Sequence, residues 1–80
     1  MGILESSLVL KLTSADTLGA IAAIQKTGII LYETMAEDDL VVVFRVRRKD
    51  IQTVQSIAVQ RGERLEILNH LGLYQEVYKI

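Results

Sequence analysis

Two stretches of the chain, LKLTSADTLGAIAAIQKTGIIL (residues 10–31) and FRVRRKDIQTVQSIAVQRGERL (residues 44–65), resemble each other at an offset of 34 residues. Each begins with alternating apolar residues, continues with an apolar run at helical spacing, and ends with a glycine and another apolar segment. Asp16 in the first stretch aligns with Asp50 in the second. This internal repeat predicts two copies of a strand-helix-strand unit.

Alternating apolar residues at the start of each unit predict a strand with one buried face. The inward positions are Leu8, Leu10 and Leu12 in the first unit and Val42, Phe44 and Val46 in the second. Gly28 and Gly62 follow the helical runs, where a residue with positive φ is needed to end a helix. A second strand is expected after each glycine, in IILYETM (residues 29–35) and in ERLEIL (residues 63–68).

The helices are expected to begin at polar residues that precede each apolar run. Ser14 or Asp16 is the predicted N-cap of the first helix, and Lys49 or Asp50 opens the second. Apolar residues on one stripe of each helix are expected to face the sheet. These residues are Leu18, Ile21, Ala22 and Ile24 in the first helix and Ile51, Val54, Ile57 and Ala58 in the second.

The polar segment AEDD (residues 36–39) predicts a turn that joins the two units as a hairpin. Two units joined in this way form a ferredoxin-like βαββαβ two-layer sandwich of the α+β class, with a four-stranded antiparallel sheet and both helices on one face. We expect the sheet order 4-1-3-2, a domain over residues 1–68, and a tail or linker over residues 69–80. The predicted core consists of Leu8, Leu10, Leu12, Leu18, Ile21, Ile24, Leu31, Phe44, Val46, Val54, Ile57, Leu65 and Ile67.

Composition narrows the possible functions. Nine Lys and Arg residues against ten Asp and Glu residues give a formal net charge of -1. A nucleic-acid-binding protein is usually strongly basic, so no nucleic-acid partner is expected. The chain has no cysteine and a single histidine, His70, so it lacks a thiolate metal site, and Ser14 lacks a partnered base. We therefore expect no catalysis, no cofactor and no metal.

The open face of the predicted sheet, which points away from the helices, combines apolar and basic residues. Side chains alternate along a strand, so Val43 and Arg45 lie on this face together with Val9 and Ile30. On this face the central strands offer Val9, Lys11, Val43 and Arg45, and none of these is an aromatic residue on which an RNA base could stack. The basic segment from Arg45 onward has two interpretations. It is either a solvated strand end paired with Glu66 or with the acidic turn, or a partner-binding edge.

A candidate interaction surface follows from this arrangement, because apolar residues on an open sheet face need cover. We expect Leu71, Leu73 or Val77 in the tail to pack on the domain or against a second copy. The cations at the rim would orient a protein partner or a homo-oligomer, or approach an anionic membrane surface. The surface comprises Val9, Ile30, Val43, Arg45, Arg47, Arg48, Lys49, Leu71 and Leu73.

The stretch DTLGAIAAIQKTGIIL (residues 16–31) resembles the opening of an ACT domain, a ferredoxin-like regulatory module. The shared pattern is an aspartate, a glycine three positions later, an apolar helix, and the dipeptide GI entering the second strand. In that family, the loop and the glycine let a small ligand, often an amino acid, approach the backbone. The resemblance therefore implies a ligand loop at Asp16 and Gly19.

A longer stretch, from Phe44 to the end of the chain, is similar to the N-terminal segment of the sporulation protein YqfD family. This resemblance implies a soluble head of a membrane-anchored bacterial protein, on the cytoplasmic side, that acts through protein interaction. The resemblance does not provide the biochemical activity of such a head. The matching residues are Val46, Arg47, Asp50, Gly62, Leu65, Ile67, Gly72 and Leu73.

Overall fold

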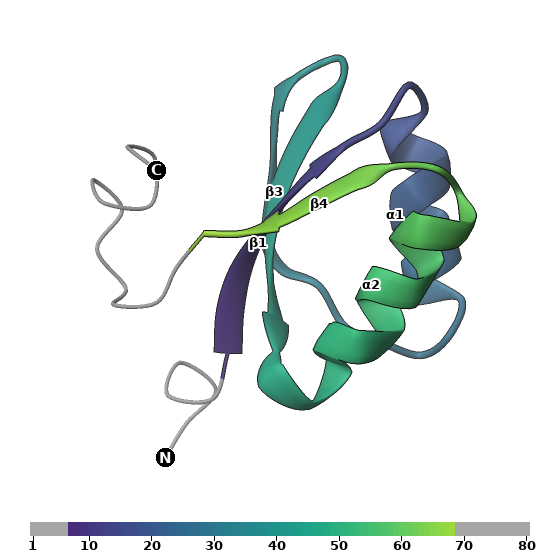
Figure 1. Ribbon diagram of the computed structural model, residues 1–80. Helices are drawn as coiled ribbons and strands as arrows, with labels where there is room; N and C mark the ends of the chain where they lie inside the picture. Colours follow the sequence, from purple (N-terminus) through teal and green to yellow (C-terminus); the bar gives the residue numbers. More distant parts are fainter. Residues whose placement is uncertain (1–6, 69–80) are drawn as a thin grey trace.

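The computed structural model describes residues 7–68 and confirms the ferredoxin-like α+β sandwich. Its antiparallel strands are ordered β2-β3-β1-β4, which is the predicted order, and Figure 1 shows both helices on one side of the sheet. The elements are β1 (Ser7–Thr13), α1 (Thr17–Gln25), β2 (Tyr32–Asp38), β3 (Val41–Arg47), the 3-10 turn η2 (Arg48–Asp50), α2 (Ile51–Gln60) and β4 (Arg64–Ile67).

The pairing register defines two ends of the sheet. β1 pairs with β3 from Ser7 opposite Arg47 to Thr13 opposite Val41, and with β4 on its other side, where Thr13 faces Arg64. The start of β1 and the end of β3 therefore lie at one end, which we call the rim end. The β2–β3 turn, the β1–α1 loop and the start of β4 lie at the opposite end, which we call the hairpin end.

The core lies between the helices and the inner face of the sheet. Phe44 is 1% exposed, and it packs with the inward residues of β1 and β3 against the buried stripes of both helices. Ile21, Leu31, Ile57 and Leu65 pack against this cluster while remaining partly exposed. The buried members are Leu10, Leu12, Ala20, Ile24, Ile29, Val42, Phe44, Val46, Val54 and Ala58.

Two residues of the predicted core are exposed. Leu18 is 82% exposed. It precedes the buried Ala20 by two residues, and at about 100° per residue it lies on the opposite side of α1. Ala22, which was expected on the same stripe, is exposed as well. Ile67 is 46% exposed because it lies on β4, an edge strand with a neighbour on one side only.

The hairpin between β2 and β3 also differs from the prediction. β2 begins at Tyr32, later than expected, and runs to Asp38, so the turn is at residues 39–40 and not at residues 36–39. Oδ1 of Asp38 accepts a hydrogen bond of 2.8 Å from the backbone N–H of Leu40. An aspartate that bonds the backbone two residues later closes a tight turn after itself, which moves the turn toward the C-terminus.

Both helices end as the sequence predicts, at glycines with positive φ: +94° at Gly28 and +71° at Gly62. Asp16 is confirmed as the N-cap of α1, since its Oδ1 accepts a hydrogen bond of 3.0 Å from the N–H of Gly19. Asp50 occupies the N-cap position of α2 but makes no capping side-chain bond there. The turn η2 ends at that position, so α2 is entered through a 3-10 turn.

Replacing Asp16 with alanine should lower the free energy of unfolding by about 1 kcal/mol, because the first turn of α1 loses its capping acceptor. Asparagine caps about as well as aspartate, so Asp16→Asn is the matched control and should keep most of the stability. Urea denaturation of the two variants measures the difference. Equal losses in both would mean that the ionic contact of Asp16, and not the cap, is what stabilises the domain.

Candidate functional site

Three consecutive cations at the rim end form the first candidate site. Arg47, Arg48 and Lys49, which we call the basic rim, end β3 and form most of the turn into α2. All three are exposed. The basic rim takes part in none of the ion pairs found within residues 7–68, although Asp50 directly follows it in η2. It is therefore a concentrated positive charge available to an anion.

The expected pairing of the basic segment with Glu66 or with the acidic turn is wrong. Glu66 pairs with Arg64 at 3.2 Å, next to it on β4. The acidic turn lies at the hairpin end, the far end of the sheet from the basic rim.

Arg45 belongs to the structure of the sheet and not to the basic rim. It is buried on the open face, where its Nε donates to Oε1 of Glu33 at 3.1 Å and its NH1 donates to Oγ of Ser7 at 3.2 Å. Glu33 has a φ of +52° and lies at a shift in the β2–β3 register. A bulge of this kind re-aims a side chain, and here the re-aimed carboxylate neutralises Arg45.

The apolar part of the open face is a second, smaller cluster. Val9 and Val43 are buried there together with Leu68. Leu68, the last residue of the strand expected over residues 63–68, donates its N–H to the carbonyl of Val9 at 2.8 Å, so it prolongs the β4 pairing beyond Ile67. Ile30 is exposed and lies before β2, not on it.

The last described residue of the chain lies toward the rim end. Leu68 bonds to Val9, and Val9 is paired with Arg45, which is two residues before the basic rim begins. The chain therefore leaves β4 on the side of the molecule that carries the cations. Leu71, Leu73 and Val77, which the sequence analysis expected to cover the open face, lie outside the described residues.

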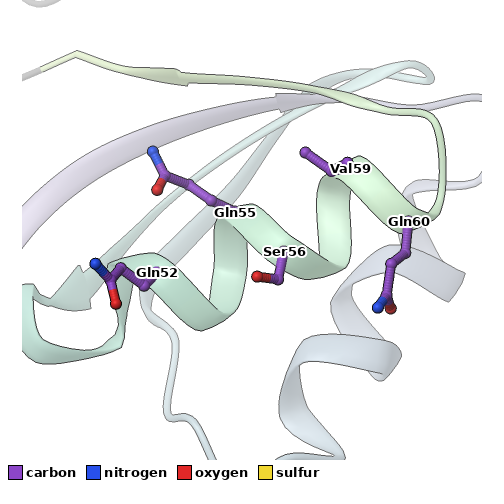
Figure 2. Close-up of a pocket in the computed structure, with 5 residues that line it drawn as sticks. All are labelled: Gln52, Gln55, Ser56, Val59 and Gln60. Atoms are coloured by element: carbon purple, nitrogen blue, oxygen red, sulfur yellow. The ribbon is translucent and has the colours of Figure 1, made fainter.

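The largest of the described hollows, about 480 Å³, lies on the outer face of α2. Figure 2 shows its five lining side chains along the helix, with Gln55 and Val59 on one flank and Gln60 on the other. None of the five carries a charge. The hollow therefore offers neutral hydrogen-bonding groups and one exposed valine, but no group for acid–base or metal chemistry.

The loop that the ACT resemblance identifies is closed by its own aspartate. A Cβ atom placed on Gly19 would lie 2.7 Å from Cγ of Asp16 and would overlap Oδ2 of the same side chain. The space beside the Gly19 backbone is thus filled by the capping carboxylate. A ligand could reach this backbone only after displacing Asp16, and a bulky residue at Gly19 would disturb the cap before it affected any ligand.

A buried carboxylate lies next to this loop at the hairpin end. The side chain of Glu63 is 8% exposed, and its Oε2 accepts hydrogen bonds from the hydroxyl of Ser14 at 2.6 Å and from Nε of Arg61 at 2.9 Å. Its other oxygen, Oε1, is buried and has no hydrogen-bond partner. Buried polar atoms are nearly always paired, so an unpaired one calls for an explanation. Sequence reasoning missed this residue because no local pattern marks it.

Glu63, Ser14 and Arg61 line a hollow of about 410 Å³, which we call the Glu63 hollow. Asp16 and the exposed Leu40 line it as well. NH2 of Arg61 lies 3.6 Å from Oδ2 of Asp16, so a single guanidinium is shared between two carboxylates. The Glu63 hollow therefore carries one uncompensated negative charge.

Among residues 7–68, no three acidic, histidine or cysteine side chains are grouped closely enough to hold a metal ion. Within the same residues, no helix is both long enough and apolar enough to span a bilayer.

Comparison with protein-family models gives no match, and comparison with curated proteins gives no significant match. The protein is a small ferredoxin-like α+β domain with an exposed basic rim at one end of the sheet. At the other end, the buried carboxylate of Glu63 and the exposed carboxylate of Asp16 share the guanidinium of Arg61.

Proposed function

We propose that the domain is a non-catalytic interaction head that approaches an anionic surface with its basic rim. The observation that carries this proposal is the set of three exposed cations, Arg47, Arg48 and Lys49, which have no described carboxylate partner. Near an anionic membrane, each Lys or Arg contributes about 1 kcal/mol of attraction. Three such residues give weak, reversible binding that orients the domain without trapping it.

The path of the chain supports a membrane as the anionic surface. Leu68, the last described residue, lies beside Val9 toward the rim end of the sheet, where the cations are. The resemblance to the YqfD family, in which a membrane span follows a similar head, implies the same geometry. On this proposal the protein is the soluble, cytoplasmic head of a membrane-anchored sporulation protein, and it recruits a protein partner or a second copy.

Vesicle sedimentation tests the proposal with the full chain. Binding to vesicles that contain phosphatidylserine is expected, and little binding to pure phosphatidylcholine vesicles. Because exposed charges are screened over about 8 Å at physiological ionic strength, added salt should release the protein. Equal binding to both kinds of vesicle, or none to either, would contradict a role for the basic rim at membranes.

A second candidate function is that of an ACT-like regulatory domain that binds a small ligand such as an amino acid. The Glu63 hollow favours it, because the hollow adjoins the predicted ligand loop at Asp16 and has a volume within the usual range for small-molecule sites. A thermal-shift screen of amino acids and nucleotides tests this candidate. A ligand that binds only the folded state raises the melting temperature, whereas an interaction head should show no shift.

A further inference from the structure

The unpaired oxygen Oε1 of Glu63 marks a possible binding site that is independent of the basic rim. Oε2 already accepts two hydrogen bonds, whereas Oε1 accepts none although it is buried. Glu63 is one of the residues that line the Glu63 hollow, so a group bound there lies next to its carboxylate. The missing partner is a hydrogen-bond donor.

The net charge of Asp16, Glu63 and Arg61 indicates which kind of hydrogen-bond donor would bind in the Glu63 hollow. Asp16 and Glu63 contribute two negative charges and Arg61 one positive charge, so a cation would neutralise the remainder. Nε of Arg61 is engaged by Glu63, and its NH2 lies beside Asp16. With its guanidinium already shared in this way, Arg61 has little attraction left for a second anionic group. A ligand carboxylate would therefore meet net repulsion, and a simple ammonium would meet net attraction.

The walls of the hollow indicate the rest of the ligand. Ala15 and Leu40 line it, and Leu40 is an exposed hydrophobic residue that an apolar ligand could cover. We propose that the Glu63 hollow binds a small aliphatic primary amine, whose ammonium group donates a hydrogen bond to Oε1 of Glu63. The apolar part of the amine lies against Leu40 and Ala15.

Three probes with the same branched carbon chain test this inference by two-dimensional ¹⁵N NMR titration of the full chain. 3-Methylbutylamine carries the ammonium, 3-methylbutanol carries a neutral donor, and leucine adds a carboxylate to the amine. We expect saturable amide shifts at Ser14, Asp16 and Gly62 with the amine, weaker ones with leucine and none with the alcohol.

Glu63→Gln should weaken binding of the amine about tenfold or more, because it removes a charge-assisted hydrogen bond. Glu66→Gln, three residues later on β4, is the matched control, and it should bind the amine as the unmodified chain does. The spectra of both variants report directly whether the domain remains folded.

Two results would overturn the inference: absence of saturable shifts with 3-methylbutylamine, or equal binding by the Glu63→Gln variant. Tighter binding of leucine than of the amine would also overturn it, and would support the ACT-like candidate instead. The outcome for the basic rim is separate, because the rim lies at the other end of the sheet and is tested with vesicles.

Discussion

Replacing Phe44 with alanine is expected to lower the free energy of unfolding by about 3–5 kcal/mol. Phe44 is the largest of the fully buried side chains, and it packs from the central strand β3 into the core between the sheet and the two helices. A single domain of 80 residues has about 4–12 kcal/mol of stability in total. The substitution should therefore leave the domain partly or wholly unfolded at room temperature.

Phe44→Leu and Val59→Ala are the matched controls for this prediction. Leucine keeps much of the buried volume, so Phe44→Leu should cost clearly less than alanine. Val59 is exposed on α2, and surface substitutions of this kind usually change stability by less than about 0.5 kcal/mol. Circular dichroism with urea denaturation measures all three. A Phe44→Ala variant as stable as Val59→Ala would mean that the core is not centred on β3.

The sheet was predictable from sequence because apolar residues recur at every second position of its two central strands. In β1 and β3, every second residue is apolar and buried against the helices, and the internal repeat fixes the topology. The stripe of α1 was not predictable in the same way. Its sequence, TLGAIAAIQ, is apolar on almost every side, so the pattern does not distinguish Leu18 from the buried Ala20.

A candidate site was predictable from sequence only where its residues are adjacent in the chain. The basic rim is a continuous run of cations, and sequence alone identifies it. The partner of Arg45 depends on a bulge in β2 and on the positive φ of Glu33, which no sequence pattern indicates. The Glu63 hollow brings Ser14 together with Arg61 and Glu63. Ser14 is far from the other two residues in the chain, and it meets them only because β4 lies beside β1.

Reversing the charges of Arg47 and Arg48 to glutamate is expected to abolish binding to anionic vesicles. The double variant removes two attractive charges and adds two repulsive ones, which changes the binding free energy by about 4 kcal/mol at about 1 kcal/mol per charge. This loss exceeds the attraction of about 3 kcal/mol that the three cations of the basic rim supply. Both residues are exposed and have no described ion pair, so the fold should not change.

The control must change the net charge equally without touching the basic rim. Lys11→Glu with Arg64→Glu meets this condition, since Lys11 lies on β1 opposite Glu66 and Arg64 lies at the hairpin end. Reversing surface charges beside Glu66 should cost at most about 1 kcal/mol of stability, and thermal melts verify that both variants remain folded. If the two double variants differ in vesicle binding, the difference is due to where the charges lie, because the net charge is the same in both variants.

The most direct test of the interaction-head account is the fraction of each chain that sediments with phosphatidylserine vesicles at about 50 mM and about 150 mM salt. The account predicts that the unmodified chain and the Lys11→Glu/Arg64→Glu control bind at low salt and dissociate at higher salt. It predicts that Arg47→Glu/Arg48→Glu does not bind at either salt concentration. Equal binding by the two double variants would contradict the account, because the basic rim would then have no specific part in recognising the surface.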